Sequence, residues 1–222
     1  MLLLGGDQHL WTYPGNWAQP WVPKEQSRNL RALAASNAAV YGVLTDGRVA
    51  RLNGSWSPSS SGSWSPIEGS ASWGASELGV TEDEHLLVIA NGKLRLFEHN
   101  ALRTLDCDAI DPVAVAGTVG DGAFLLDSAG TLYFNGDGRC DKVPAPAPLR
   151  RIAASSGRLL AVDTDGSVWR RRENAWARLP PPMKYQTGQA PVAKQAQDVA
   201  VSPYSTWLAD TEGAIFMLSD EI

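Results

Sequence analysis

The chain has 222 residues, a formal net charge of −5 at pH 7, 44% hydrophobic residues and 19% charged residues. This amount of apolar material and this low charge exclude an intrinsically disordered chain. The acidic balance argues against nucleic acid as a partner, because phosphate binding relies on clustered Lys and Arg. No apolar stretch approaches the roughly 18 residues that span a bilayer, so no membrane partner is expected.

The first residues, Met1–Gly6, carry no basic region, and their apolar run is too short for a signal peptide. We therefore expect a cytoplasmic protein. Because no linker divides the sequence, we expect a single domain over residues 1–222. The sequence leaves open whether its two cysteines, Cys107 and Cys140, pair, and reduced thiols are the expected state in a reducing cytoplasm.

An internal repeat organises the chain, since short apolar runs break at a glycine turn and resume in the same register. A partial copy opens the sequence at Met1–Tyr13. The five full copies are Tyr41–Leu52, Leu86–Phe97, Phe124–Phe134, Leu159–Arg170 and Thr206–Leu218. Their turn glycines lie 36 to 47 residues apart, which is the period typical of propeller blades and other stacked repeats.

Each copy has the pattern of antiparallel strands. Dipeptides such as Asp46-Gly47 and Asn91-Gly92 favour two-residue hairpin turns. Strands of small residues precede the hairpins, at Leu33–Ser36, Val113–Gly117, Ile152–Ser156 and Val199–Ser202. We place these strands innermost, because crowding around a common axis leaves room only for Ala, Gly and Ser. Segments with Trp after the hairpins, among them Ser63-Trp64 and Ala175-Trp176, are predicted to be outer strands.

These elements predict an all-β fold, a β-propeller of about six blades, with five or seven as alternatives. The opening unit lacks an inner strand and the closing unit lacks an outer one. We therefore expect the N- and C-terminal strands to pair and close the ring, because closure removes exposed sheet edges.

Catalytic and metal chemistry find little support in the sequence. The histidines, His9, His85 and His99, do not stand at metal-ligand spacing. No nucleophile elbow, P-loop or Cys-x-x-Cys motif occurs. The predicted inner strands offer Ala and Ser, whereas a propeller enzyme draws carboxylates or histidines to its central channel. We therefore expect no enzyme, no cofactor and no metal site.

Two insertions, at about residues 53–76 and 180–197, interrupt the period, and loops longer than a scaffold needs are often functional. Tryptophan is a strong interface anchor. The candidate partner-binding residues are Trp56, Trp64, Trp73, Lys184 and Tyr185, joined by the acidic run Glu82, Asp83 and Glu84. The alternative for the tryptophans is packing between blades, and the alternative for the acidic run is a solvated turn.

The residues from Leu149 to Trp169 resemble the blade of the regulator of chromosome condensation family. The continuation, Arg170–Leu179, looks more like a tectonin repeat, as does the stretch Asp198–Asp210. The similarity covers most of the chain as a pattern. It implies a non-enzymatic propeller.

Two functional classes follow. In the first, the loops cover another protein, such as a basic toxin or effector that this chain neutralises as an immunity protein, and opposite charge would speed their association. In the second, resemblance to tectonins implies a carbohydrate-binding lectin with one shallow site per blade. Equivalent sugar sites demand equivalent residues, yet the hairpin turns vary in sequence, so we favour the protein-binding class.

Overall fold

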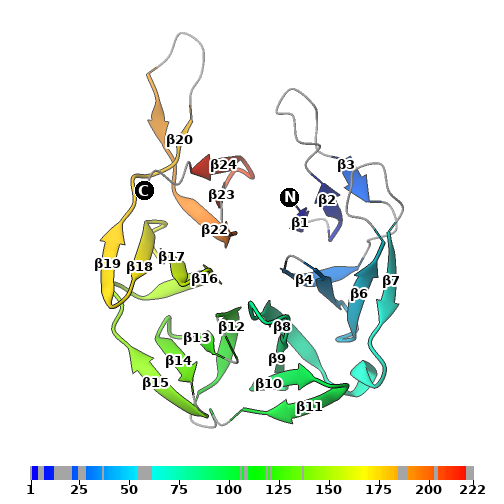
Figure 1. Cartoon of the computed structure of the whole chain (residues 1–222). Coiled ribbons are helices and arrows are strands. Elements are labelled where there is room, and N and C mark those ends of the chain that lie inside the picture. Colours follow the sequence, from blue (N-terminus) through cyan, green and yellow to red (C-terminus); the bar gives the residue numbers. More distant parts are fainter. Residues whose placement is uncertain are drawn as a thin grey trace.

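The computed structural model describes residues 2–4, 8–12, 22–24, 29–36, 38–54, 62–105, 107, 110–118, 120, 122–136, 138–184, 190–202 and 205–218. These residues form antiparallel sheets that stand side by side around a common axis (Figure 1). One short 3-10 helix, η1 (Ser70–Ser72), interrupts the strands. The predicted all-β propeller is confirmed.

Four sheets contain four strands each. One consists of β4 (Leu30–Ala35), β5 (Val40–Leu44), β6 (Val49–Asn53) and β7 (Ser63–Pro66), and the next of β8 (Ala75–Val80), β9 (Leu86–Ala90), β10 (Lys93–Glu98) and β11 (Ala101–Thr104). The third consists of β12 (Pro112–Gly117), β13 (Ala123–Asp127), β14 (Leu132–Gly136) and β15 (Arg139–Val143). The fourth consists of β16 (Leu149–Ser155), β17 (Arg158–Asp163), β18 (Val168–Arg172) and β19 (Ala175–Arg178). In each sheet, consecutive strands are neighbours.

The sheets nearest the two chain ends contain three strands. The first sheet consists of β1 (Leu2–Leu4), β2 (Leu10–Thr12) and β3 (Val22–Lys24), and the last consists of β22 (Ala196–Val201), β23 (Thr206–Asp210) and β24 (Ile215–Leu218). A separate hairpin of β20 (Met183–Lys184) and β21 (Val192–Ala193) precedes the last sheet.

The strands nearest the axis are β4, β8, β12, β16 and β22 (Figure 1), and four of them contain the small-residue segments expected at the hub. Crowding is measurable at Gly117 in β12, where a Cβ atom would lie only 2.3 Å from Val80 O in the neighbouring sheet. At this position of the hub only glycine fits, as the sequence predicts for strands crowded around the axis, whereas other positions of the inner strands carry larger side chains. The inner strand β8 was missed, because it lies at the edge of the predicted 53–76 insertion.

Among the strands that the structure describes, none is an inner strand of the first sheet, as the sequence predicts. In three other sheets the start of an inner strand bonds to the preceding hairpin turn, for example Ala75 N to Gly47 O at 3.2 Å. Leu30 N bonds in the same way to Gln8 O at 3.4 Å. The turn between β1 and β2 therefore corresponds to the turn between second and third strands elsewhere. Five blades reach the hub, and the first sheet is a partial one.

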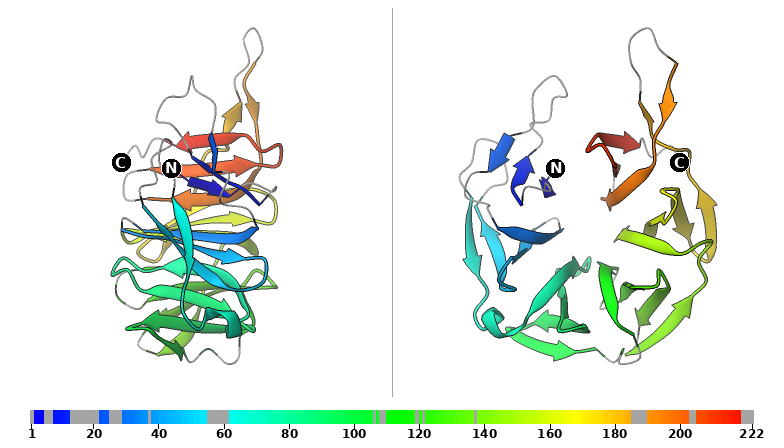
Figure 2. Two further views of the ribbon diagram at one scale, coloured as in Figure 1. Left: turned by 90° about the vertical axis from the view of Figure 1, so that its right-hand side faces the viewer. Right: turned by 180° about the vertical axis from the view of Figure 1, so that it is seen from behind.

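The expected closure of the ring was wrong. Among the described strands, none of β1–β3 pairs with any of β22–β24, and the ring stays open between these two sheets (Figures 1 and 2). The physical reason is local pairing: Leu2–Leu4 pairs with Leu10–Thr12 as part of its own sheet, so it is not the missing strand of the last sheet.

The core consists of layers between adjacent sheets. One cluster joins Val43 and Val49 to Leu86 and Val88 of the following sheet, and three more repeat this arrangement around the ring. The three sheets from β8 to β19 therefore each bury one face against the preceding sheet and the other against the following sheet, as in a stack of nearest-neighbour interfaces.

Cys107 and Cys140 form a disulfide, with their Cα atoms 5.4 Å apart. This pairing differs from the reduced thiols that the sequence favours. Asn135, only 2% exposed, donates hydrogen bonds from Nδ2 to both sulfur atoms, at 3.3 and 3.4 Å. The bridge ties β15 to the segment that leads from β11 to β12.

Candidate functional site

The side of the last sheet that faces the ring opening carries Trp207, Ala209, Ile215 and Met217, which we call the terminal face. Strands alternate their side chains between two faces. The other side chains of this sheet, among them Leu208 and Phe216, pack against the preceding sheet. The terminal face is therefore the side that a further blade would cover.

Exposure distinguishes the terminal face from the same side of the other sheets. The residues flanking each hairpin turn in the equivalent register are Val43 and Val49, Ile89 and Leu94, Leu126 and Leu132, and Val162 and Val168. All eight are no more than 1% exposed. In the last sheet, Ala209 and Ile215 are only half-buried, and Met217 is 49% exposed. No described sheet covers this apolar surface.

The β20–β21 hairpin stands out from the ring beside the last sheet (Figures 1 and 2). Lys184 Nζ lies 3.1 Å from Glu212 Oε2 in the turn between β23 and β24, and Lys194 Nζ bonds to Glu212 Oε1. The hydrogen bonds from Lys194 and Lys184 hold the pKa of the Glu212 carboxyl below its usual value. These contacts fix the base of the hairpin at one end of β24.

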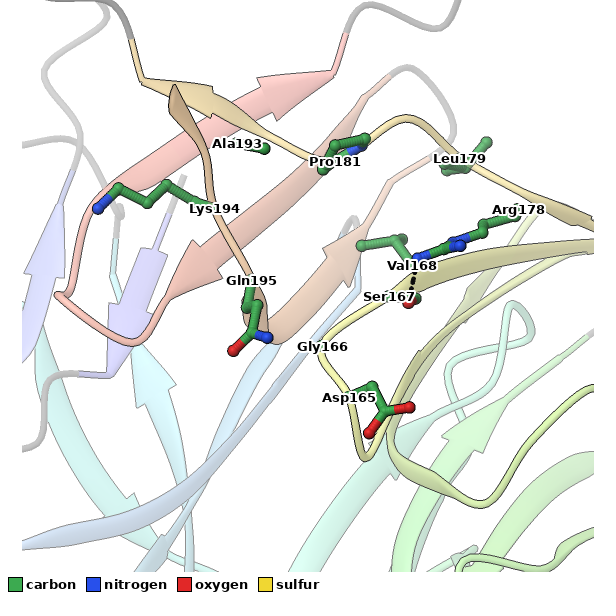
Figure 3. Close-up of a pocket in the computed structure, with 10 residues that line it drawn as sticks. All are labelled: Asp165, Gly166, Ser167, Val168, Arg178, Leu179, Pro181, Ala193, Lys194 and Gln195. Atoms are coloured by element: carbon green, nitrogen blue, oxygen red, sulfur yellow. Dashed lines mark hydrogen bonds between the residues drawn. The ribbon is translucent and has the colours of Figure 1, made fainter. Parts of the chain in front are cut away.

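A pocket of about 260 Å³ lies at the base of the same hairpin (Figure 3). Its walls come from the turn at Asp165–Ser167 and from the chain entering the last sheet at Ala193–Gln195. Arg178 donates to Ser167 Oγ across one side at 2.8 Å. The pocket is small, and both polar and apolar side chains line it.

The hub carries charges that the sequence analysis missed. Every inner strand contains a β-bulge near its start, where the pairing register shifts between the first and third residues. A bulge re-aims side chains. The residues at or next to these bulges include Arg31, Glu77, Arg150, Arg151 and Asp198. In two of these strands the signal was an arginine directly after the first apolar residue, Arg31 after Leu30 and Arg150 after Leu149.

These hub charges act on one another. Arg151 Nε lies 3.9 Å from Asp198 Oδ1, and Arg150 donates to Ala196 O. Burial raises the pKa of Glu77, partly offset by the bond from Leu78 N and by the charge of Arg151. Desolvation by the surrounding hub likewise raises the pKa of Asp198, although its side chain is still 61% exposed. The two carboxylates lie among three arginines and interact with them, which favours a structural role at the hub.

The predicted tryptophans occupy different environments. Trp73 is 8% exposed and packs on Phe97 with ring centroids 5.1 Å apart, so it belongs to the core and is not available on the surface. Its burial follows from η1, which turns the chain back onto the sheet. Trp64 is half-buried in the outer strand β7. Trp56 and Tyr185 lie outside the described residues.

The acidic run lies in the turn between β8 and β9, at the hub. Glu84 accepts a hydrogen bond from Ser36 Oγ of the preceding sheet, and Glu82 accepts one from Ser156 N. Two of the three carboxylates therefore connect blades, while Asp83 is exposed. Contact of these residues with a partner stays a prediction.

Three side chains of kinds that a lectin would use, Asp163, Trp169 and Trp176, are engaged within a blade or between neighbouring blades. Asp163 accepts from its own turn amides and from Trp169 Nε1, and Trp176 Nε1 donates to Pro144 O at 2.8 Å. The described part of the chain contains no group of three or more metal-ligating side chains and no helix that could span a membrane.

No family model and no curated protein sequence matches the chain. Solved structures share its fold. A chain of the nidogen/laminin complex has a TM-score of 0.67 at 12% identity, with 98% of this chain and 88% of that chain covered. Yeast RCC1 (Prp20), solved with Kap60, has a TM-score of 0.59 at 11% identity, with 98% and 67% covered.

Human WBSCR16 has a TM-score of 0.59 at 12% identity, with 90% of this chain and 64% of that chain covered. This chain thus spans less than two thirds of the length of WBSCR16. At such identities the likeness shows the fold alone. The RCC1-like propeller that the sequence predicts is confirmed at the level of the fold.

Proposed function

We propose that this protein is a non-enzymatic propeller that binds another protein through its terminal face. The observation that supports this proposal most directly is the exposure of Ile215. Its side chain is half-buried, whereas the residues at the equivalent position of the other sheets are no more than 1% exposed: Val49, Leu94, Leu132 and Val168. Contiguous apolar surface left open on a folded domain marks an interaction site. The hairpin beside it provides a polar rim with Lys184 and Lys194.

Proteins of the same fold support this class of function. The yeast RCC1 structures concern binding to Kap60, Gsp1p and histones, and another neighbour comes from a complex with laminin. Virginiamycin B lyase from Staphylococcus aureus shares the fold too, so the fold alone does not select binding over catalysis. The apolar face that no described sheet covers supports the proposal of binding.

The partner we propose is a basic protein, such as a toxin or effector that this chain neutralises in the cytoplasm. Its net charge of −5 and the exposed Asp83 beside the hub favour a basic surface. Opposite charge accelerates association more than it adds affinity. Apolar contact with the terminal face would then make the complex dissociate slowly.

Two variants of equally exposed apolar residues test the docking surface. Met217→Asp places a charge on the terminal face, whereas Val113→Asp places one on β12, at 46% exposure compared with 49% for Met217. A partner protein is first identified by co-purification from the native host. Its affinity for each of the two variants is then measured by calorimetric titration. Met217→Asp should abolish binding and Val113→Asp should retain it; equal affinities for both variants would refute the proposed surface.

The toxin hypothesis has its own test. The product of each neighbouring gene is expressed in a sensitive host with and without this chain. Growth rescued by the native chain, and lost with Met217→Asp, supports neutralisation through the terminal face. If no neighbouring product is toxic or bound, the partner belongs to another class.

A further inference from the structure

The outer edge of β24 differs from every equivalent edge in the four-stranded sheets. The third strands β6, β10, β14 and β18 each pair with a fourth strand. Among the described residues, no strand pairs with β24 on the side away from β23. A strand at a sheet edge presents a row of backbone donors and acceptors ready to pair with another chain.

The direction of the β24 backbone groups follows from the hairpin register. In three sheets, the backbone carbonyl of the residue two positions after the turn glycine accepts a hydrogen bond from a backbone amide that follows the fourth strand. These bonds run from Ile67 N to Val49 O (2.8 Å), from Leu105 N to Leu94 O (3.0 Å) and from Leu179 N to Val168 O (2.8 Å). Ile215 holds this position in the last sheet. Because direction alternates along a strand, the amides of Ile215 and Met217 both point outward.

The fourth strands also resemble one another in the side chain that they place at one position of the pairing with the third strand. Five positions after the turn glycine, the facing residue of the fourth strand is Trp64, Leu102, Cys140 or Trp176. Leu102 and Trp176 pack from there against the preceding sheet. The equivalent residue of β24 is Leu218, which is half-buried and pairs with Thr206 of β23, while no described strand lies on its outer side.

We propose that the free edge of β24 accepts an extended segment of the partner protein as the fourth strand of the last sheet. The segment places a Trp or Leu side chain opposite Leu218. This inference rests on the proposed function and specifies how the partner is recognised: backbone pairing gives affinity and one apolar anchor gives register. The terminal face lies directly beside this edge, so one partner covers both.

A peptide from the chain itself serves as the probe. Residues 173–180, ENAWARLP, contain the fourth strand β19 with its anchor Trp176. The fluorescently labelled peptide should bind the intact protein saturably in an anisotropy titration. The same peptide with Ala in place of the Trp should bind about tenfold or more weakly, as expected for an interface anchor.

Variants of Met217 separate the backbone from the side chain. Met217→Pro removes one outward amide but no bond to β23, and proline is tolerated on edge strands. The Met217→Pro variant should fold, which circular dichroism will check, and it should no longer bind the peptide. Met217→Leu keeps the amide and should retain peptide affinity within about twofold, a difference of roughly 0.4 kcal/mol.

The outcomes distinguish the two proposals. If the partner protein binds Met217→Pro as tightly as the native chain but fails to bind Met217→Asp, docking on the terminal face stands and strand addition is refuted. If both variants bind normally, both proposals fail. A concentration-dependent dimer in analytical ultracentrifugation, abolished by Met217→Pro, would assign the edge to a second copy of this chain and overturn the inference.

Discussion

The indole Nε1 of Trp169 donates a 2.8 Å hydrogen bond to Oδ2 of Asp163, six residues earlier, across the base of a hairpin. Tyr133 OH bonds to Asp127 Oδ2 at 3.2 Å in the same arrangement. In the last hairpin the aspartate is Asp210, but the aromatic residue is Phe216, which has no donor. Asp210 is 2% exposed, and its Oδ2 has no hydrogen-bond partner among the described residues.

Replacing Phe216 by Tyr should therefore stabilise the protein. The new hydroxyl supplies the missing donor to Asp210, and one such bond contributes about 0.5–1.5 kcal/mol to the free energy of unfolding. Chemical denaturation of native and variant proteins measures the difference. The gain should vanish in an Asp210→Ala background, and Tyr133→Phe should show the reverse sign. A gain that survives removal of Asp210 would point to a different cause.

Substitution of Gly117 by Ala should destabilise the hub. The added Cβ would meet Val80 O at 2.3 Å and Thr81 N at 2.7 Å, and both atoms belong to backbone that cannot rotate away. Overpacking of this kind costs about 1–3 kcal/mol. Thermal unfolding measures the loss. Gly120→Ala is the control for the added methyl group, because no atom lies within 4 Å of a Cβ there, although its positive φ adds strain.

Reduction of the Cys107–Cys140 disulfide should lower stability. The two residues are 33 apart in sequence, and the chain-entropy relation gives about 3–4 kcal/mol for closing a loop of this length. Calorimetric melting with and without a thiol reductant measures the shift, and the Cys107→Ser/Cys140→Ser double variant should reproduce it. Unchanged melting on reduction would show that the pair is not oxidised in solution.

Glu77→Gln should stabilise the protein at neutral pH. Burial raises the folded-state pKa of Glu77 above its ordinary 4.5, outweighing the attraction of Arg151. The folded chain then binds a proton where the unfolded chain has released it, so the unfolding free energy falls as pH rises from about 4.5 through the raised pKa. In Glu77→Gln, the unfolding free energy should therefore depend less on pH. The remaining dependence should come from Asp198, whose pKa is also raised.

Denaturation at several pH values measures the slope for Glu77→Gln. Glu68→Gln is the matched control, because it removes the same charge from an exposed position. A variant less stable than the native chain at neutral pH would show that the attraction to the hub arginines outweighs the effect of burial.

Two tryptophans proposed as partner contacts should respond differently to truncation. Trp73→Ala removes a core side chain packed on Phe97 and should cost about 3–5 kcal/mol. Trp64→Ala, from the half-buried outer strand, should cost less. Urea denaturation compares the two, and an equal loss would contradict the packing difference between them.

Much of the fold follows from local sequence. The glycine turns at Gly47 and Gly166, the apolar residues on either side of them, and the small residues around Gly117 each determine their own strand or turn, because hairpin pairing is settled within about a dozen residues. Repetition of this unit then requires stacked sheets. The sequence also indicated correctly that, within the described residues, the first unit has no inner strand and the last has no outer one.

Tertiary structure decided what depends on distant partners. The hub charges Glu77 and Asp198 come together only because bulges turn residues of separate strands toward one axis. The disulfide depends on the approach of two segments 33 residues apart. Whether Ile215 is covered depends on whether sheets at opposite chain ends meet. The sequence determined the blades, and contacts between elements far apart in the chain determined the open ring.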